Sequence, residues 1–144
     1  MPVLVTTRDC RVPVLATRLS RSGRRLLGAL KRSEAELSVL LVSDRVMRQL
    51  NRDWRGRDRP TDVLSFSQHE GSGVAPRELL GDVVIAVPTA ERQAEACGET
   101  LLAASERLLI HGVLHLLGYD HERSEAEARR MQRRERRLAS VLGS

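Results

Sequence analysis

The order of hydrophobic and polar positions predicts strands and helices that alternate along the chain. Short runs of aliphatic and β-branched residues predict strands at 3–6, 37–42, 62–66 and 82–87. Apolar residues at helical spacing predict an amphipathic helix between the first two strands: Val14, Leu19, Leu26, Leu27 and Leu30. Strands separated by helices point to one layered α+β or α/β domain, although the pattern does not give the strand order.

Helix signals also follow the second strand and fill the C-terminal half. We expect Asp44 to cap a helix that runs to about Asp53. Pro88 and Gly98 bracket another helix, because proline favours the first turn and glycine the position after the last. Two more helices are predicted over 101–117, which is apolar on both faces, and over 124–142. Gly, Ser and Pro are frequent in 68–76, which predicts an exposed loop.

Composition and length fit one soluble globular domain over residues 1–144, with 41% hydrophobic and 30% charged residues. The longest apolar run, 83–87, is too short to cross a bilayer, and the charges in MPVLVTTRDCR argue against a signal peptide. We therefore expect a cytoplasmic protein that does not bind membranes. Cys10 and Cys97 form no paired motif and are expected to be free thiols.

The formal net charge is +5, and all but one of the 24 basic residues are arginine. Arginine presents a flat, permanently charged fork that suits phosphate oxygens, so the charge is compatible with a nucleic-acid partner. Coding bias explains the same composition equally well.

Three of the four histidines lie in the segment HGVLHLLGYDH as His111, His115 and His121. His111 and His115 are four apart on a predicted helix, so their rings project from one face and can share a metal ion. Gly118 predicts a sharp helix end, after which the chain can return His121 as a third ligand. Three neutral imidazoles leave a fourth position open for water, which is typical of catalytic rather than structural metal sites.

This spacing does not decide the reaction. Metzincin proteases share it, but they carry a glutamate base directly after the first histidine. Here that position is Gly112, which cannot move a proton, so a peptidase of that type is disfavoured. Asp62 and Asp120 are candidate bases, although a role for Asp120 in orienting a ligand histidine is favoured.

The segment NRDWRGRDRPTDVLSF adds a second group of candidate residues. Its arginines, Arg52, Arg55, Arg57 and Arg59, are expected in a turn-rich stretch between a helix and a strand, where guanidinium groups can reach an anion. Trp54 and Phe66 could stack on unpaired bases, but core packing is the favoured interpretation of both.

Three motifs together, HGVLHLLGYDH, RGRDRPTDVLSF and LGDVVI, resemble the YbeY family of bacterial endoribonucleases over roughly residues 35–142. The resemblance implies a zincin-like α+β domain with a mixed four-stranded sheet and about five helices. It implies one metal ion on His111, His115 and His121, usually zinc, although nickel or another divalent transition metal also suits three histidines. It assigns functional importance to Arg55.

The family acts on single-stranded RNA in maturation of the 3′ end of small-subunit ribosomal RNA and in ribosome quality control. The implied partners are therefore RNA, the small ribosomal subunit and ribosome-assembly proteins. Two alternatives stay open: a zincin-type metallopeptidase, and a non-enzymatic assembly factor with a structural metal. The six arginines of 129–137 could contact RNA phosphates, and a solvated helix face is an equally good interpretation.

Overall fold

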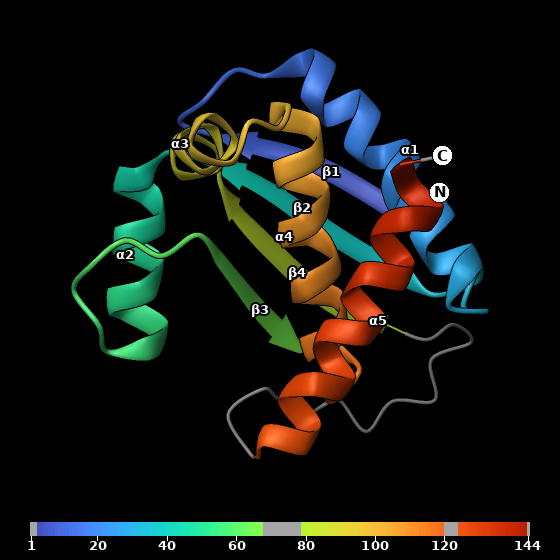
Figure 1. Ribbon diagram of the computed structural model, residues 1–144. Helices are drawn as coiled ribbons and strands as arrows, with labels where there is room; N and C mark the ends of the chain where they lie inside the picture. The colour runs from blue at the N-terminus through green and yellow to red at the C-terminus, as the bar shows by residue number, and fades with distance from the viewer. Residues whose placement is uncertain (1–2, 68–78, 120–123, 144) are drawn as a thin grey trace.

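A mixed sheet of four strands forms the centre of the computed structural model, which describes residues 3–67, 79–119 and 124–143 (Figure 1). The strands are β1 (Val3–Arg8), β2 (Glu36–Val42), β3 (Val63–Ser67) and β4 (Leu79–Ala86). Their order in the sheet is β1-β2-β4-β3. Strands β1, β2 and β4 run parallel to one another, and β3 lies antiparallel to β4 at the edge of the sheet. This arrangement, with five helices in the described part of the chain, confirms the expected α+β fold.

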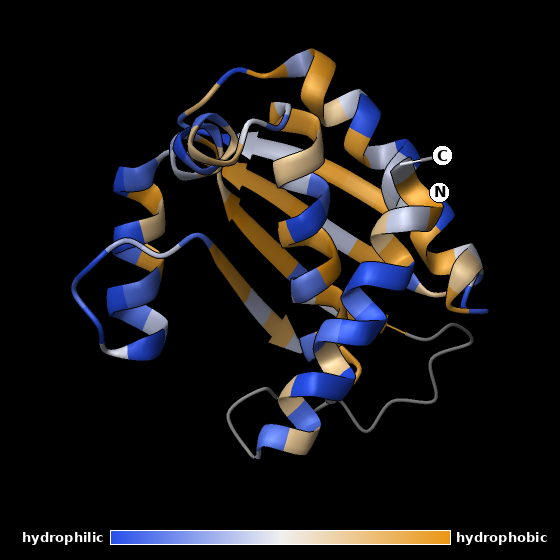
Figure 2. Ribbon diagram, viewed as in Figure 1, coloured by the Kyte–Doolittle hydropathy of each residue, from blue (hydrophilic) through white to orange (hydrophobic). Residues whose placement is uncertain are grey.

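Helices cover both faces of the sheet, and the alternation of side chains along each strand decides which residues face which helix. Val39, Leu41, Val83 and Ile85 point into the larger core cluster. That cluster is closed by α1 (Pro13–Ala29), α4 (Leu101–Leu116) and α5 (Glu125–Gly143). The intervening residues face the smaller cluster under α2 (Asp44–Arg55). Figure 2 shows the mostly hydrophobic sheet and the many hydrophilic residues of the helices around it.

Two details of α2 differ from the sequence prediction. Ser43, and not Asp44, is the N-cap: its Oγ accepts a hydrogen bond from the Val46 N–H at 3.2 Å. The helix also continues to Arg55, two residues beyond the expected end, because Gly56 supplies the left-handed conformation that stops it (φ 69°). Arg55 therefore lies on a helix and not in a loop.

The other elements lie within a few residues of their predicted positions. Pairing with β2 extends β1 to Arg8, and β4 begins three residues earlier than expected and gives way to α3 (Val87–Cys97) one residue earlier. Gly98 ends α3 with φ 66°, as predicted. The predicted loop 68–76 lies outside the described residues. None of the described helices has the length and apolar character needed to span a membrane.

Candidate metal centre

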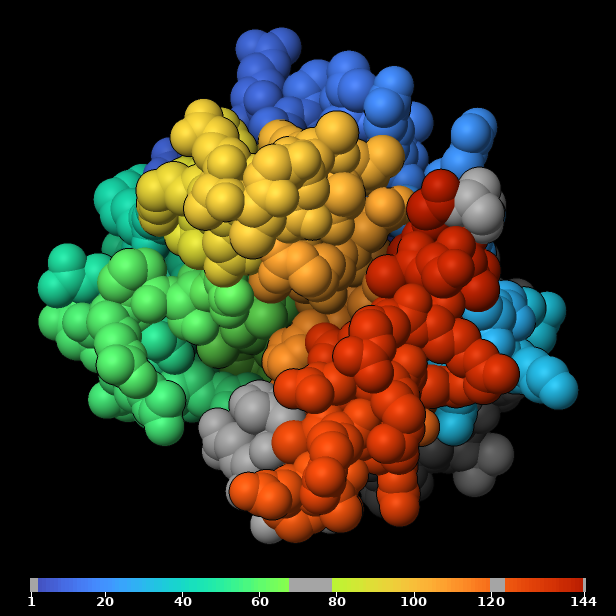
Figure 3. Space-filling view, viewed as in Figure 1, coloured from blue at the N-terminus to red at the C-terminus, as the bar shows by residue number. Residues whose placement is uncertain are grey.

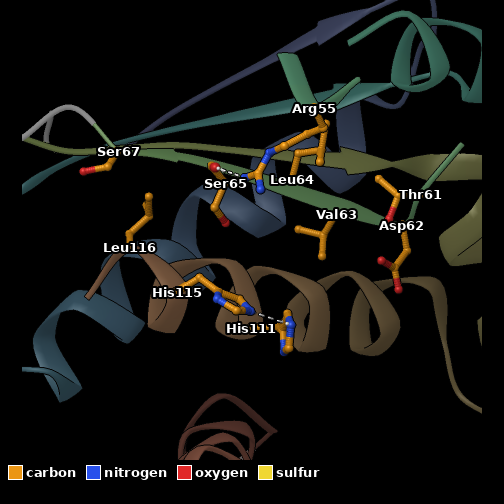
Figure 4. A pocket seen from close by; sticks show the side chains of 10 residues that line it. All are labelled: Arg55, Thr61, Asp62, Val63, Leu64, Ser65, Ser67, His111, His115 and Leu116. Carbon is orange, nitrogen blue, oxygen red and sulfur yellow. Dashed lines mark hydrogen bonds between the residues drawn. The ribbon is translucent and has the colours of Figure 1, made fainter. Parts of the chain in front are cut away.

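Helix α4 positions the two described histidines. Thr100 caps the helix, its Oγ1 accepting a hydrogen bond from the Ala103 N–H at 3.0 Å. His111 and His115 follow one turn apart near the C-terminal end, and their rings meet edge to face (Figure 4). The two Nε2 atoms are 3.1 Å apart. Both histidines line the same cavity.

The distance between the Nε2 atoms suits a shared metal ion. Two nitrogens bound tetrahedrally to one zinc ion at about 2.0–2.1 Å lie about 3.3 Å from each other. The observed 3.1 Å is close to that value without any movement of the helix. The residues present therefore fit a divalent transition metal.

Glu135 of α5, which sequence reasoning missed, holds the ring of His111. Its Oε2 lies 2.8 Å from Nδ1 of His111. A carboxylate accepts hydrogen bonds, so Nδ1 of His111 is the donor in this pair, which leaves Nε2 as the nitrogen that lies beside Nε2 of His115. A carboxylate behind a histidine is a frequent arrangement at metal sites, where it fixes the tautomer and raises the basicity of the ligand.

A signal for Glu135 is present in the sequence. Met131, Leu138 and Leu142 are buried and form the inner stripe of α5. Glu135 falls on the same stripe, four residues after Met131 and three before Leu138. An acidic residue on an otherwise apolar stripe needs a partner, and here that partner is His111.

The third predicted ligand, His121, and the predicted orienting residue, Asp120, lie outside the described residues. Within the ranges that the structure describes, no group of three or more histidine, cysteine or acidic side chains is placed to hold a metal ion. The predicted helix end is confirmed: Gly118 has φ 98°, and the N–H of Tyr119 closes the last turn on the carbonyl of Leu114. The three-histidine site thus stays a prediction, with two of its members brought together.

Gly112 allows α4 to approach the sheet closely. A Cβ at this position would lie 2.7 Å from Cγ1 of Val83 and 3.1 Å from Oγ of Ser65. The same Ser65 Oγ donates a hydrogen bond to the carbonyl of Gly112 at 3.0 Å. A side chain here would overlap Val83 unless Val83 or the helix moved, so the packing opposes a glutamate base of the metzincin type at this position.

The cavity beside the histidines has a volume of about 540 Å³ and lies between α4 and β3. Its lining brings together residues from α2, from β3 and the segment before it, and from α4: Arg55, Thr61, Asp62, Val63, Leu64, Ser65, Ser67, His111, His115 and Leu116. In Figure 4, the histidines lie along α4 and Arg55 lies across the cavity at β3. Asp62, a candidate base, accepts a hydrogen bond from Nε2 of Gln93 at 3.0 Å.

Arg55 reaches the cavity from the last turn of α2. Its Nη2 donates a hydrogen bond to the carbonyl of Ser65 at 2.9 Å, and its Cζ lies 5.9 Å from the centre of the Phe66 ring. The Phe66 ring packs against the smaller core cluster, as expected for a core residue. The prediction that Trp54 packs in the core is wrong, because Trp54 is 69% exposed and meets Phe66 only edge to face.

A second hollow continues from the first and shares Arg55, Thr61 and Leu64 with it. Arg57 and Arg59 also line it, so three guanidinium groups follow one path away from the histidines. The nearby carboxylate of Asp58 is paired with Arg48 and not with the arginines that line this hollow. The hydrogen bond from Arg48 at 2.9 Å lowers the pKa of Asp58. The combined groove therefore presents an excess of positive charge.

Proteins of one family are similar to this chain over most of its length. A family model described as "Endoribonuclease YbeY" matches residues 11–143. The chain is 46% identical over 144 residues to Endoribonuclease YbeY of Geobacter sulfurreducens, with 99% of this chain and 96% of that protein covered. It is 50% identical over 143 residues to Endoribonuclease YbeY of an Anaeromyxobacter species, with 99% and 73% covered.

Among solved structures, the solution structure of TM1509 from Thermotoga maritima is similar to this fold. The TM-score is 0.69 at 25% sequence identity, and the match covers 97% of this chain and 88% of TM1509. The sequence matches and the shared fold lead to one conclusion: the chain belongs to the endoribonuclease YbeY family.

Proposed function

We propose that this protein is a metal-dependent endoribonuclease that cleaves single-stranded RNA, acting as one hydrolase domain over residues 1–144. The observation that carries the proposal is the cavity that holds the Nε2 atoms of His111 and His115 on one side and Arg55 on the other. The relatives named Endoribonuclease YbeY support the same reaction class.

His111, His115 and His121 would hold the metal ion, which we infer to be one zinc ion or another divalent transition metal. When bound, such an ion supplies a Lewis acid for activating water and for neutralising phosphate charge. The His111–Glu135 hydrogen bond involves Nδ1 and so orients the other ring nitrogen, Nε2, as the ligand atom.

Arg55 acts on the phosphate. Its hydrogen bond to the Ser65 carbonyl uses one nitrogen and fixes the fork at the cavity wall, while the side chain stays exposed to an incoming substrate. Charge that grows on the phosphate oxygens is stabilised most by donors that are already in place, and this electrostatic effect is usually the largest contribution to catalysis. Asp62, on the same wall, is a candidate proton acceptor.

Single-strand preference follows from the surroundings of Arg55. The exposed ring of Trp54 stands beside it and can stack on a base only when that base is unpaired. Arg57 and Arg59 extend the positive path along which a flexible strand can lie. We further propose that the substrate is the 3′ end of small-subunit ribosomal RNA, in the cytoplasm, with the small subunit and ribosome-assembly proteins as partners.

The test compares purified wild-type protein with His115→Ala and Arg55→Glu on single-stranded RNA, duplex RNA and casein. We expect cleavage of single-stranded RNA alone, loss of metal and cleavage together in His115→Ala, and loss of cleavage with retained metal in Arg55→Glu. Cleavage by Arg55→Glu at the wild-type rate would refute the phosphate role of Arg55. Hydrolysis of casein would instead support the peptidase alternative, which the packing at Gly112 opposes.

A further inference from the structure

A separate hollow of about 350 Å³ lies against α5 and shares no lining residue with the catalytic cavity. We call it the α5 arginine pocket, and its lining consists of one aromatic ring and four guanidinium groups: Tyr119, Arg130, Arg133, Arg134 and Arg137. The arginines recur at the three- and four-residue intervals that place side chains on one face of a helix. In Figure 3, α5 forms an extended part of the surface that faces the viewer.

Within the described residues, no carboxylate forms an ion pair with these four arginines, and none of their side chains has a hydrogen-bond partner. Glu127 lies one turn before Arg130, yet its Oε2 is buried without a partner. Glu135 is committed to His111. Four arginines elsewhere do have acidic partners: Arg45 with Asp9, Arg48 with Asp58, Arg92 with Asp44 and Arg107 with Glu99.

One of the lining residues, Arg134, also has an unsatisfied donor. The Nε atom of Arg134 is buried and has no hydrogen-bond partner in the described chain. Buried donors are nearly always satisfied, and an oxyanion bound by the neighbouring guanidinium groups would offer Nε a charge-assisted partner after a small shift of the Arg134 side chain. Such an anion would also relieve the repulsion between four like charges that surround one space.

We propose that the α5 arginine pocket binds backbone phosphates of the RNA strand at a distance from the bond that is cleaved. Arginine forks match phosphate oxygens, and the Tyr119 ring offers a surface on which an unpaired base can stack. The pocket is close to the catalytic cavity along the chain, because Tyr119 follows His115 by four residues and Arg134 adjoins Glu135. This proposal rests on the proposed function, since it takes the substrate to be RNA.

The experiment compares the parent with a variant that carries Arg130→Gln, Arg133→Gln and Arg137→Gln. The three side chains are exposed, and Arg134 is kept because it is partly buried. The matched control is Arg11→Gln, Arg18→Gln and Arg21→Gln, which removes three exposed charges outside α5. Binding of 2′-O-methyl oligouridylates of about 5 and about 30 nucleotides is measured by fluorescence anisotropy over a range of salt concentrations. Cleavage of a short unmodified RNA is measured in parallel.

We expect the pocket variant to bind the long oligonucleotide more weakly, with a slope of log K against log salt that is shallower by about 2, since each single-strand phosphate contact contributes about 0.7. Binding and cleavage of the short RNA should match the parent, and the control should keep the parental slope. An unchanged slope in the pocket variant would overturn the proposal, and so would an equal loss in the control. Failure of the parent to cleave any RNA would instead count against the proposed function. The binding comparison tests the α5 arginine pocket separately, because it measures affinity for RNA and does not depend on cleavage.

Discussion

The hydrogen bond between Glu135 and His111 gives the sharpest test of the metal centre. The perturbation is Glu135→Ala, which removes the acceptor 2.8 Å from Nδ1 and leaves both metal-facing nitrogens in place. Without the carboxylate, this hydrogen bond no longer fixes the ring orientation or the tautomer of His111, and a proton on Nε2 would compete with a metal ion. We therefore expect weaker zinc binding in a protein whose two described histidines are unchanged.

The expected size follows from the kind of bond that is lost. Both side chains are about three-quarters buried, with 28% of His111 and 24% of Glu135 exposed, so solvent screens the pair only in part. Loss of such a partner typically costs 10- to 100-fold in metal affinity, or about 1.4–2.7 kcal/mol. Glu135→Gln keeps an acceptor but loses its charge, and a neutral bond is about half as strong. Its zinc affinity should therefore fall only about three- to tenfold.

The assay is competition for zinc between metal-free protein and a chromophoric chelator at neutral pH, with circular dichroism as a check of the fold. Glu91→Ala is the matched control, since Glu91 is an exposed acid on α3. The order of zinc affinity should be parent and control first, then Glu135→Gln, then Glu135→Ala. Equal affinity in all four proteins would show that Glu135 does not orient the ligand.

Three further predictions follow from the described contacts. Gly112→Ala should lower the free energy of unfolding by about 1–3 kcal/mol, because its Cβ meets Val83. Gly28→Ala, whose Cβ meets nothing closer than 3.9 Å, should not, and equal melting temperatures for the two variants would contradict this packing. The fluorescence of Trp54, the only tryptophan, should be quenched by single-stranded RNA and not by an abasic strand; equal quenching by both would exclude stacking. Chelation should lower the melting temperature by only about 5–10 °C relative to protein with zinc at about 100 times its Kd, whereas complete unfolding would favour a structural metal.

The parts of the site that the sequence predicted are those governed by local geometry. The helical period alone places His111 and His115 on one face, and the structure has their nitrogens 3.1 Å apart. Gly98 and Gly118 end their helices because they adopt positive φ at little steric cost, which is a property of the residue itself. No knowledge of distant residues is needed for either inference.

The parts that were missed depend on contacts between distant segments. The Glu135–His111 pair joins positions 24 residues apart, so no local pattern links them. The position of Arg55 at the cavity depends on β3 being the edge strand, and the strand order could not be inferred from hydrophobic periodicity. Trp54 was expected in the core because large aromatic residues usually pack there, but the last turn of α2 turns it outward.

Helix α4 shows how the packing of the core controls the geometry of the site. Successive residues are about 100° apart around a helix, so Gly112 and His111 face different neighbours. The close contact of Gly112 with Val83 and the hydrogen bond from Ser65 fix the rotation of α4 against the sheet. Because the helix is held in this rotation, the histidines point into the cavity opposite Arg55. The residue that cannot supply the base of a metzincin protease therefore orients the two histidines that are predicted to bind the metal.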